Sequence, residues 1–296
     1  MRTRTVLLGF ALGTVLILMV FGTVTLIAVT VPQSSRISFS SNAVGVIDVF
    51  DVITDSRRVL EELAEYRDDS SVRAIVVRID SPGGAVGPSQ EIYSEIVRTK
   101  QTKTVIASLG GMAASGGYYI ACGADMIVAN PGTLTGSIGA IMEFMNLEEL
   151  YKWARVQNVV VKSGRYKDMG STNRPLSAEE QALLQDMVDD VLGQFVEAIA
   201  QGRNLPADQV RAIADGRIFT GAQAQKLGLV DRLGNFNDAI DAAAEMAGIE
   251  GRPRVIRVKP KPVDILDLLL DSVASRFWQS VEKARVRAIR PWNLQS

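Results

Sequence analysis

The sequence predicts an α/β fold with a mainly parallel sheet, preceded by one transmembrane helix. Three observations predict it: an uncharged N-terminal run, short β-branched runs that alternate with helical patterns, and glycine-rich turns directly after two of those runs. Strands that alternate with helices are typical of a parallel sheet covered by helices. With 296 residues, of which 47% are hydrophobic, the chain is long enough for one large domain or two modest ones.

The N-terminal segment has the length and composition of a membrane anchor. Residues 5–31 contain no charge, and a helix of that length exceeds a hydrocarbon core of roughly 30 Å. Arg2 and Arg4 precede it, so residues 1–4 are expected in the cytoplasm and the rest of the chain outside it. A cleaved signal peptide is the alternative, but its apolar part is about 7–15 residues. We therefore expect a single-pass protein of the cell membrane, with a polar linker at 32–42.

After the linker, the chain begins with a β-α-β pattern. Residues 43–50 and 72–79 are β-branched runs that predict strands. An amphipathic pattern through Val59, Leu63 and Tyr66 predicts a helix between them. Consecutive strands joined by a helix pair in parallel, so we expect these two strands to be neighbours in the sheet.

The alternation continues to about residue 250. Before residue 131 we expect a helix at 88–99 and a strand at 104–109. A short helix that begins near Ser115 and a further strand at 126–129 follow. Short strands and three helices are expected after it, the helices at about 178–199, 221–227 and 236–247. We place one catalytic domain at residues 43–258.

Residues 259–296 predict a linker followed by a C-terminal amphipathic helix. Its apolar stripe runs through Leu266, Leu270, Val273 and Phe277. Packing on a partner subunit, on the membrane surface or on the domain's own core all fit this pattern.

The composition excludes several kinds of chemistry. The chain has no histidine, which removes the usual general base, the usual zinc ligand and any Ser-His-Asp triad. Cys122 is the single cysteine, so an internal disulfide is impossible, and its apolar surroundings in the sequence predict that it is buried. The 32 basic and 33 acidic residues nearly cancel, which argues against a nucleic-acid partner.

Two glycine turns contain the first candidate site residues. Ser115 follows the strand and small residues of 104–114 and precedes a helix, where unpaired N–H groups favour the negative charge of an oxyanion. A second turn, Ser-Pro-Gly-Gly at 81–84, follows the strand at 72–79, so both turns are expected at the carboxyl edge of the sheet. Each motif alone also fits an ordinary turn or helix cap.

A lysine can activate a serine when desolvation lowers the pKa of its amine. An apolar run at 159–161 predicts a strand that leads Lys162 and Lys167 into a turn. The residues alone do not choose between these two lysines, and a solvated surface charge is the ordinary role of a single lysine.

Four motifs occur together in one order. They are Ser-Pro-Gly-Gly at 81–84, Ala-Ala-Ser-Gly-Gly-Tyr-Tyr at 113–119, Thr-Gly-Ser-Ile-Gly at 135–139 and Lys-Ser-Gly-Arg-Tyr-Lys-Asp at 162–168. In combination they resemble the signal peptide peptidase A family, in its short form, over residues 43–248.

The resemblance implies a ClpP- and crotonase-like spiral of ββα units and a role for individual residues. Ser115 matches the nucleophile, Lys167 the general base, and Ser137 the hydroxyl that orients the lysine. The backbone positions that match the oxyanion hole are Gly83 or Gly84, together with Gly116.

The resemblance also implies an activity and an assembly. The substrates would be signal-peptide remnants and other short or unfolded hydrophobic peptides, cut through an acyl-enzyme without a metal, nucleotide or other cofactor. Family members form ring- or dome-like homo-oligomers, an octamer among them, in which the serine and lysine of short forms meet across a subunit interface. Two other classes stay open: a crotonase-like acyl-CoA enzyme and a non-catalytic membrane scaffold.

Overall fold

The computed structural model describes residues 42–257. The predicted anchor at 5–31, nearly all of the linker and the C-terminal segment at 259–296 lie outside the described residues. Within residues 42–257, none of the helices has the length and apolar character needed to cross a bilayer.

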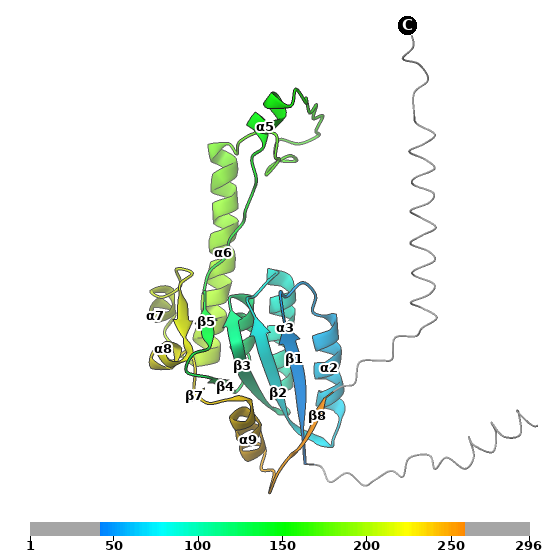
Figure 1. The fold of residues 1–296 in the computed structure, drawn as a ribbon, viewed down its shortest axis with the longest axis vertical. Helices are drawn as coiled ribbons and strands as arrows, with labels where there is room; N and C mark the ends of the chain where they lie inside the picture. Colours follow the sequence, from blue (N-terminus) through cyan, green and yellow to red (C-terminus); the bar gives the residue numbers. More distant parts are fainter. Residues whose placement is uncertain (1–41, 258–296) are drawn as a thin grey trace, which may run out of the picture.

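A mainly parallel sheet forms the centre of the molecule (Figure 1). Its middle strands are β1 (Ala43–Phe50), β2 (Val72–Ser81) and β3 (Thr104–Ala114), which pair in parallel. The other strands are β4 (Met126–Ala129), β5 (Leu134–Gly136), β6 (Ile218–Thr220), β7 (Arg232–Leu233) and β8 (Arg254–Arg257). Only the β5–β6 pair is antiparallel among the pairings described. The predicted α/β class with a mainly parallel sheet is confirmed.

Helices cover both faces of this sheet. On one face α2 (Arg57–Asp68), α3 (Val86–Thr99) and α4 (Gly116–Ala121) share a buried cluster with strand residues such as Ile47 and Val77. On the other face α9 (Phe236–Met246) packs on strand residues that include Val44 and Val76. Successive strand residues point to opposite faces, so both must be apolar, which explains the unbroken apolar runs in these strands.

The long helix α6 (Ala178–Arg203) extends past the sheet and leads to a projection (Figure 1). We call residues 141–176 the arm. The chain after β5 runs beside α6, and α5 (Glu148–Trp153), which belongs to the arm, lies at the far end of α6 from the sheet. Ser177 caps α6 in a capping box with Glu180, which fixes where the arm ends and the helix begins. Two short helices, α7 (Ala207–Arg211) and α8 (Gly221–Lys226), complete the side of the body next to α6.

One element was predicted wrongly. Residues 159–161 lie in the arm without any strand assignment, and the side chains of Val159 and Val161 are 83% and 95% exposed. The β-branched run has the propensity of a strand, but in residues 42–257 it has no neighbouring strand with which to pair.

Candidate active site

Ser115 lies at the junction of β3 and α4 with an unusual backbone conformation. Its φ is +51° and its ψ is −122°, which costs a non-glycine residue about 1–3 kcal/mol. The Ser115 N–H donates to the carbonyl of Gly136 at 2.8 Å, and its own carbonyl accepts from the Tyr119 N–H at 2.9 Å. The hydrogen bond to β5 on one side and the bond to α4 on the other therefore keep Ser115 in this strained backbone conformation. A serine on a strained strand-to-helix turn is a recurring arrangement for an exposed nucleophile.

The turn that follows β2 packs directly against Ser115. A Cβ atom on Gly83 would lie 2.8 Å from both the Ser115 Cβ and the Gly116 nitrogen, and the φ of Gly83 is +103°. A Cβ atom on Gly116 would lie 3.3 Å from the Gly84 nitrogen. The structure thus brings both glycine turns together at the carboxyl edge of the sheet, as the sequence predicts.

The hydrogen bonds of this turn distinguish the two glycines. The Gly83 N–H donates to the Ser81 hydroxyl at 3.1 Å, whereas the Gly84 N–H has no acceptor among the described residues. The Gly116 N–H opens α4, and the first amides of a helix have no acceptor within it. The N–H groups of Gly84 and Gly116 are therefore the pair available to an oxyanion next to Ser115.

The loop after β1 supports this turn, a contact that the sequence reasoning missed. The Ile53 N–H donates to the Gly83 carbonyl at 2.9 Å, and the Ala85 N–H donates to the Ile53 carbonyl at 2.7 Å. The Ser81 hydroxyl donates to the Asp51 carbonyl at 2.5 Å. No local pattern predicts these bonds, because they join segments about 30 residues apart.

Ser137 follows β5 and lies beside Ser115 across the strand pair. Gly136 is the register partner of Ala114, so the two serines occupy adjacent positions at the ends of β3 and β5. The φ of Ser137 is +49°, and its N–H donates to the Arg217 carbonyl at 2.8 Å. Non-glycine residues with positive φ cluster at functional sites. Both candidate serines share this feature.

Both candidate lysines lie in the arm. The Lys162 amine donates to the Asp168 carboxylate at 2.6 Å and to the Arg165 carbonyl at 3.0 Å. The Lys167 side chain is exposed and makes no hydrogen bond or ion pair within residues 42–257. Lys162 is thus held by an ion pair within the arm, whereas Lys167 has no such partner among the described residues.

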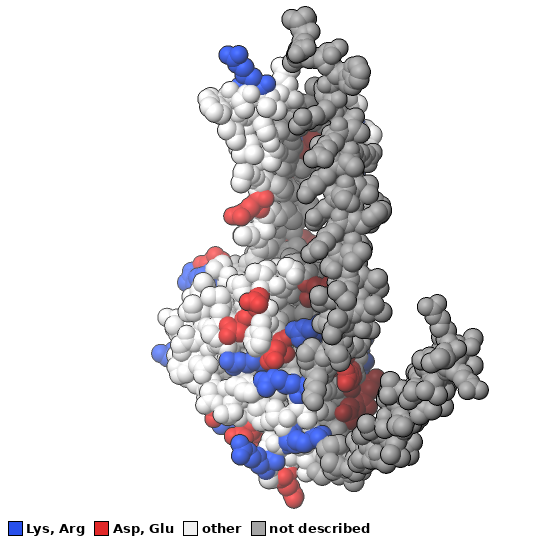
Figure 2. Space-filling view, turned by 45° about the vertical axis from the view of Figure 1, so that its right-hand side comes forward, with Lys and Arg blue, Asp and Glu red and all other residues white. Residues whose placement is uncertain are grey.

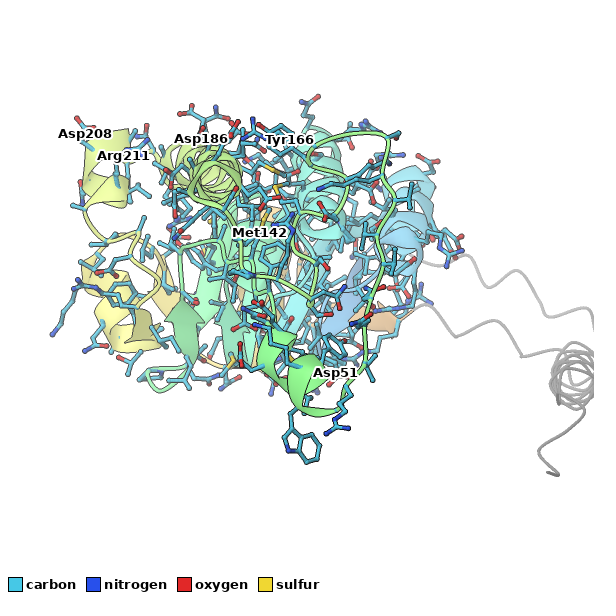
Figure 3. The ribbon with its side chains drawn as sticks, turned by 90° about the horizontal axis from the view of Figure 1, so that it is seen from above. Asp51, Met142, Tyr166, Asp186, Asp208 and Arg211 are labelled. Atoms are coloured by element: carbon cyan, nitrogen blue, oxygen red, sulfur yellow. The ribbon has the colours of Figure 1, made fainter. Side chains whose placement is uncertain are left out.

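One chain does not place Lys167 next to Ser115. Tyr166 bonds to Glu179 at the start of α6, whereas Phe195 of the same helix lines the pocket beside Ser115. The 16 residues between those helix positions correspond to about 24 Å of helix. Viewed from above, Met142 and Tyr166 of the arm lie over the body (Figure 3). The partial burial expected for the base is not provided by the described part of a single chain.

A small pocket of about 30 Å³ opens beside Ser115. Its apolar wall is formed by Val86, Tyr119, Val191 and Phe195. The rings of Tyr119 and Phe195 pack with their centroids 4.9 Å apart, which stiffens this wall. A larger open groove of about 670 Å³ between α9 and β8 contains none of the predicted site residues. Of these two, only the smaller pocket is lined by Ser115 and Gly116.

A strained serine in one glycine turn, packed against a second glycine turn at the carboxyl ends of parallel strands, defines a site for acyl transfer. The model of Peptidase family S49 matches residues 97–250, and the Clp protease model matches residues 46–132. The chain therefore belongs to peptidase family S49, the signal peptide peptidase A family, and is a serine peptidase.

Proteins similar in sequence to this chain are also named as proteases. A protein of Synechocystis, "Putative protease slr0021", is 48% identical over 199 residues, 67% of this chain and 72% of its own length. An Enterococcus faecium protein, "Putative signal peptide peptidase SppA", is 39% identical over 184 residues, 62% of this chain and 54% of its own length. Protease 4 of Salmonella typhi is 35% identical over 236 residues, 79% of this chain but 38% of its own length. The match thus spans less than two thirds of the last two relatives.

Proposed function

We propose that this protein is a membrane-anchored endopeptidase in which Ser115 is the nucleophile and Lys167 of a neighbouring copy is the general base. One observation carries the proposal: Ser115 and its oxyanion donors are assembled within one chain, while the free lysine is held away from them on the arm. A site that lacks only its base is completed most simply by a second copy.

The chemistry follows from the groups at the site. The neutral Lys167 amine takes the proton of the Ser115 hydroxyl as the oxygen attacks the peptide carbonyl. The N–H groups of Gly84 and Gly116 stabilise the oxyanion, and Ser137 orients the lysine. The lysine then protonates the departing amine, which leaves an acyl-enzyme. Water, deprotonated by the same lysine, releases the carboxylate product and restores Ser115.

The surface of the arm supports assembly with other copies. The arm exposes many large apolar side chains, among them Ile141 and Trp153, each 83% exposed. In Figure 2 charged side chains gather on the body, and the visible part of the arm carries charged side chains as well as uncharged surface. Large exposed apolar surfaces mark protein interfaces. Packing the arm on a neighbour would bury this surface and remove Lys167 from water, which is the environment that a lysine general base requires.

Contacts between the arm of one copy and the body of the next would be heterologous, and heterologous contacts generate a ring when the rotation between copies closes. A ring-like homo-oligomer, such as an octamer, is therefore the assembly that we propose. The uncharged run at 5–31 supports an anchor in the cell membrane, with the catalytic domain outside the cytoplasm.

The proposed substrates are signal-peptide remnants and other short or unfolded hydrophobic peptides. Support comes from the small apolar pocket beside Ser115 and from the Enterococcus relative, which is named as a signal peptide peptidase. Such peptides would bind as extended strands beside the site.

A fluorogenic hydrophobic peptide tests the catalytic assignment. Ser115→Ala and Lys167→Ala are expected to lower turnover by at least about 10³-fold, because a nucleophile and its base act as a unit. Lys162→Ala is the matched control and is expected to keep most of the activity. Full activity of either of the first two variants would exclude the proposed pair, and an active Lys167→Ala beside an inactive Lys162→Ala would assign the base to Lys162.

A further inference from the structure

The strand that carries Ser115 contains a bulge opposite Asp80. Ile79 of β2 is in register with Leu109 of β3, but Ser81, two residues later, is in register with Ala113. Asp80 therefore faces three residues of β3, at positions 110–112. Extra residues in one strand interrupt the ladder and bend that strand, and such bulges occur next to active sites.

The Asp80 carboxylate takes the place of the missing ladder bonds. One of its oxygens accepts from the Gly111 N–H at 3.2 Å, and the other accepts from the Met112 N–H at 3.0 Å. A Cβ atom on Gly110 would lie 2.6 Å from the carboxylate, so glycine is needed there. On the other side of the bulge, the buried Thr133 hydroxyl donates to the Gly110 carbonyl at 2.6 Å. Two side chains thus pair with three backbone groups of the bulge: the N–H groups of Gly111 and Met112 and the carbonyl of Gly110.

The bulge is also where β3 changes its neighbour. Before it, β3 pairs with β4, up to the Leu109–Ala129 pair. After it, β3 pairs with β5, from Met112–Leu134 onward. The second pairing continues into the hydrogen bond between the Ser115 N–H and the Gly136 carbonyl. The bulge therefore directs the strand to the partner that holds Ser115 in its strained conformation.

Asp80 is joined to the other half of the site through its main chain. Its carbonyl accepts from the Asp51 N–H at 3.1 Å, and the next residue, Ser81, begins the turn that presents Gly84. Asp80 thus binds β3 through its carboxylate, binds the loop after β1 through its carbonyl, and leads directly into the turn at 81–84.

We infer that Asp80 is a positioning residue, which sets the placement of Ser115 relative to the Gly84 N–H by holding the bulge of β3. This inference rests on the proposed role of Ser115 as nucleophile. Asparagine at position 80 keeps one acceptor oxygen but turns an NH₂ group toward the second backbone N–H, so one of the two bonds is replaced by a repulsive contact.

The test compares Asp80→Asn with Asp125→Asn in the full-length assembled protein. Asp125 also accepts a backbone N–H of β3, from Val105 at 2.9 Å, but at the opposite end of the strand. Steady-state turnover of a fluorogenic peptide, the rate of labelling by a serine-directed fluorophosphonate and the thermal midpoint are measured for each variant. Thr133→Val disturbs the same bulge without a change of charge. Ser115→Ala is included as a reference.

For Asp80→Asn we expect kcat and the labelling rate to fall about 10- to 100-fold with little change in KM, because displacing a reacting group by about 1 Å has an effect of that size. Thr133→Val is expected to show the same kcat-selective loss to a smaller extent, and it decides the question if Asp80→Asn does not fold. Asp125→Asn is expected to lower only the thermal midpoint.

Equal kcat values for folded Asp80→Asn and Asp125→Asn would overturn the positioning role, as would unchanged kcat in Thr133→Val if Asp80→Asn does not fold. An active Ser115→Ala would instead overturn the proposed function, so the two failures are distinguishable.

Discussion

Gly83 provides a quantitative test of how tightly the two glycine turns are fitted together. In Gly83→Ala the new Cβ would meet the Ser115 Cβ and the Gly116 nitrogen at 2.8 Å, and the φ of +103° disfavours any side chain. The backbone strain costs about 1–3 kcal/mol and the overpacking about 1–3 kcal/mol, so the loss of stability is about 2–6 kcal/mol. For a domain of this size that lowers the thermal midpoint by about 5–20 °C.

The activity of Gly83→Ala is expected to fall more than its stability alone explains. The added methyl group pushes directly on the nucleophile and on an oxyanion donor, and a displacement of about 1 Å lowers turnover about 10²-fold. The assay is peptide turnover per folded molecule, beside a thermal melt. Gly87→Ala is the matched control, because no atom lies within 4 Å of the Cβ it would add in α3. Turnover of Gly83→Ala equal to that of Gly87→Ala would refute the packing of the turns described above.

Three further predictions concern other parts of the chain. Burial raises the pKa of the Cys122 thiol to about 12, so iodoacetamide at pH 8 should label it only after unfolding; rapid labelling of the folded protein would contradict its burial. Hydrogen bonds from Arg174 lower the pKa of Glu180 from 4.5 to about 2, so the stability this pair contributes is complete above pH 4.5 and is lost as the pH falls toward 2. The difference in thermal midpoint between wild type and Arg174→Met should shrink over that range, and a difference independent of pH would argue against the pair. Val191→Ala enlarges the pocket beside Ser115 and should raise about 10-fold the preference for a bulky over a small substrate residue before the scissile bond. An unchanged preference would show that this substrate residue does not bind in the pocket.

Much of the sheet could be predicted from the sequence because its signals are local. The runs at 43–50 and 126–129 are strands with the predicted bounds, since an apolar β-branched run between turn residues has few other solutions in a buried sheet. Both glycine turns were placed correctly at the carboxyl edge, because parallel pairing brings those strand ends together.

The features that escaped prediction depend on contacts between distant segments. The strand predicted at 104–109 continues to Ala114, where the Asp80 carboxylate supports the bulge. The residues around 104–114 do not reveal this bond, because Asp80 is about 30 residues away in the sequence. The choice between Gly83 and Gly84 depends on the Ser81 hydroxyl, which occupies the first amide. The exposure of Lys167 depends on how the arm folds away from the sheet, and the local sequence does not specify that.

Complementation between two inactive variants tests the central claim most directly. Ser115→Ala supplies an intact lysine and Lys167→Ala an intact serine, so co-expression at equal amounts gives mixed assemblies. If each site joins Ser115 of one copy to Lys167 of the next, about a quarter of the sites in a randomly mixed ring are intact, and about a quarter of wild-type turnover returns. Mixed assemblies, confirmed by differently tagged copies that co-purify, that show no turnover above that of the separate variants would contradict a site shared between copies.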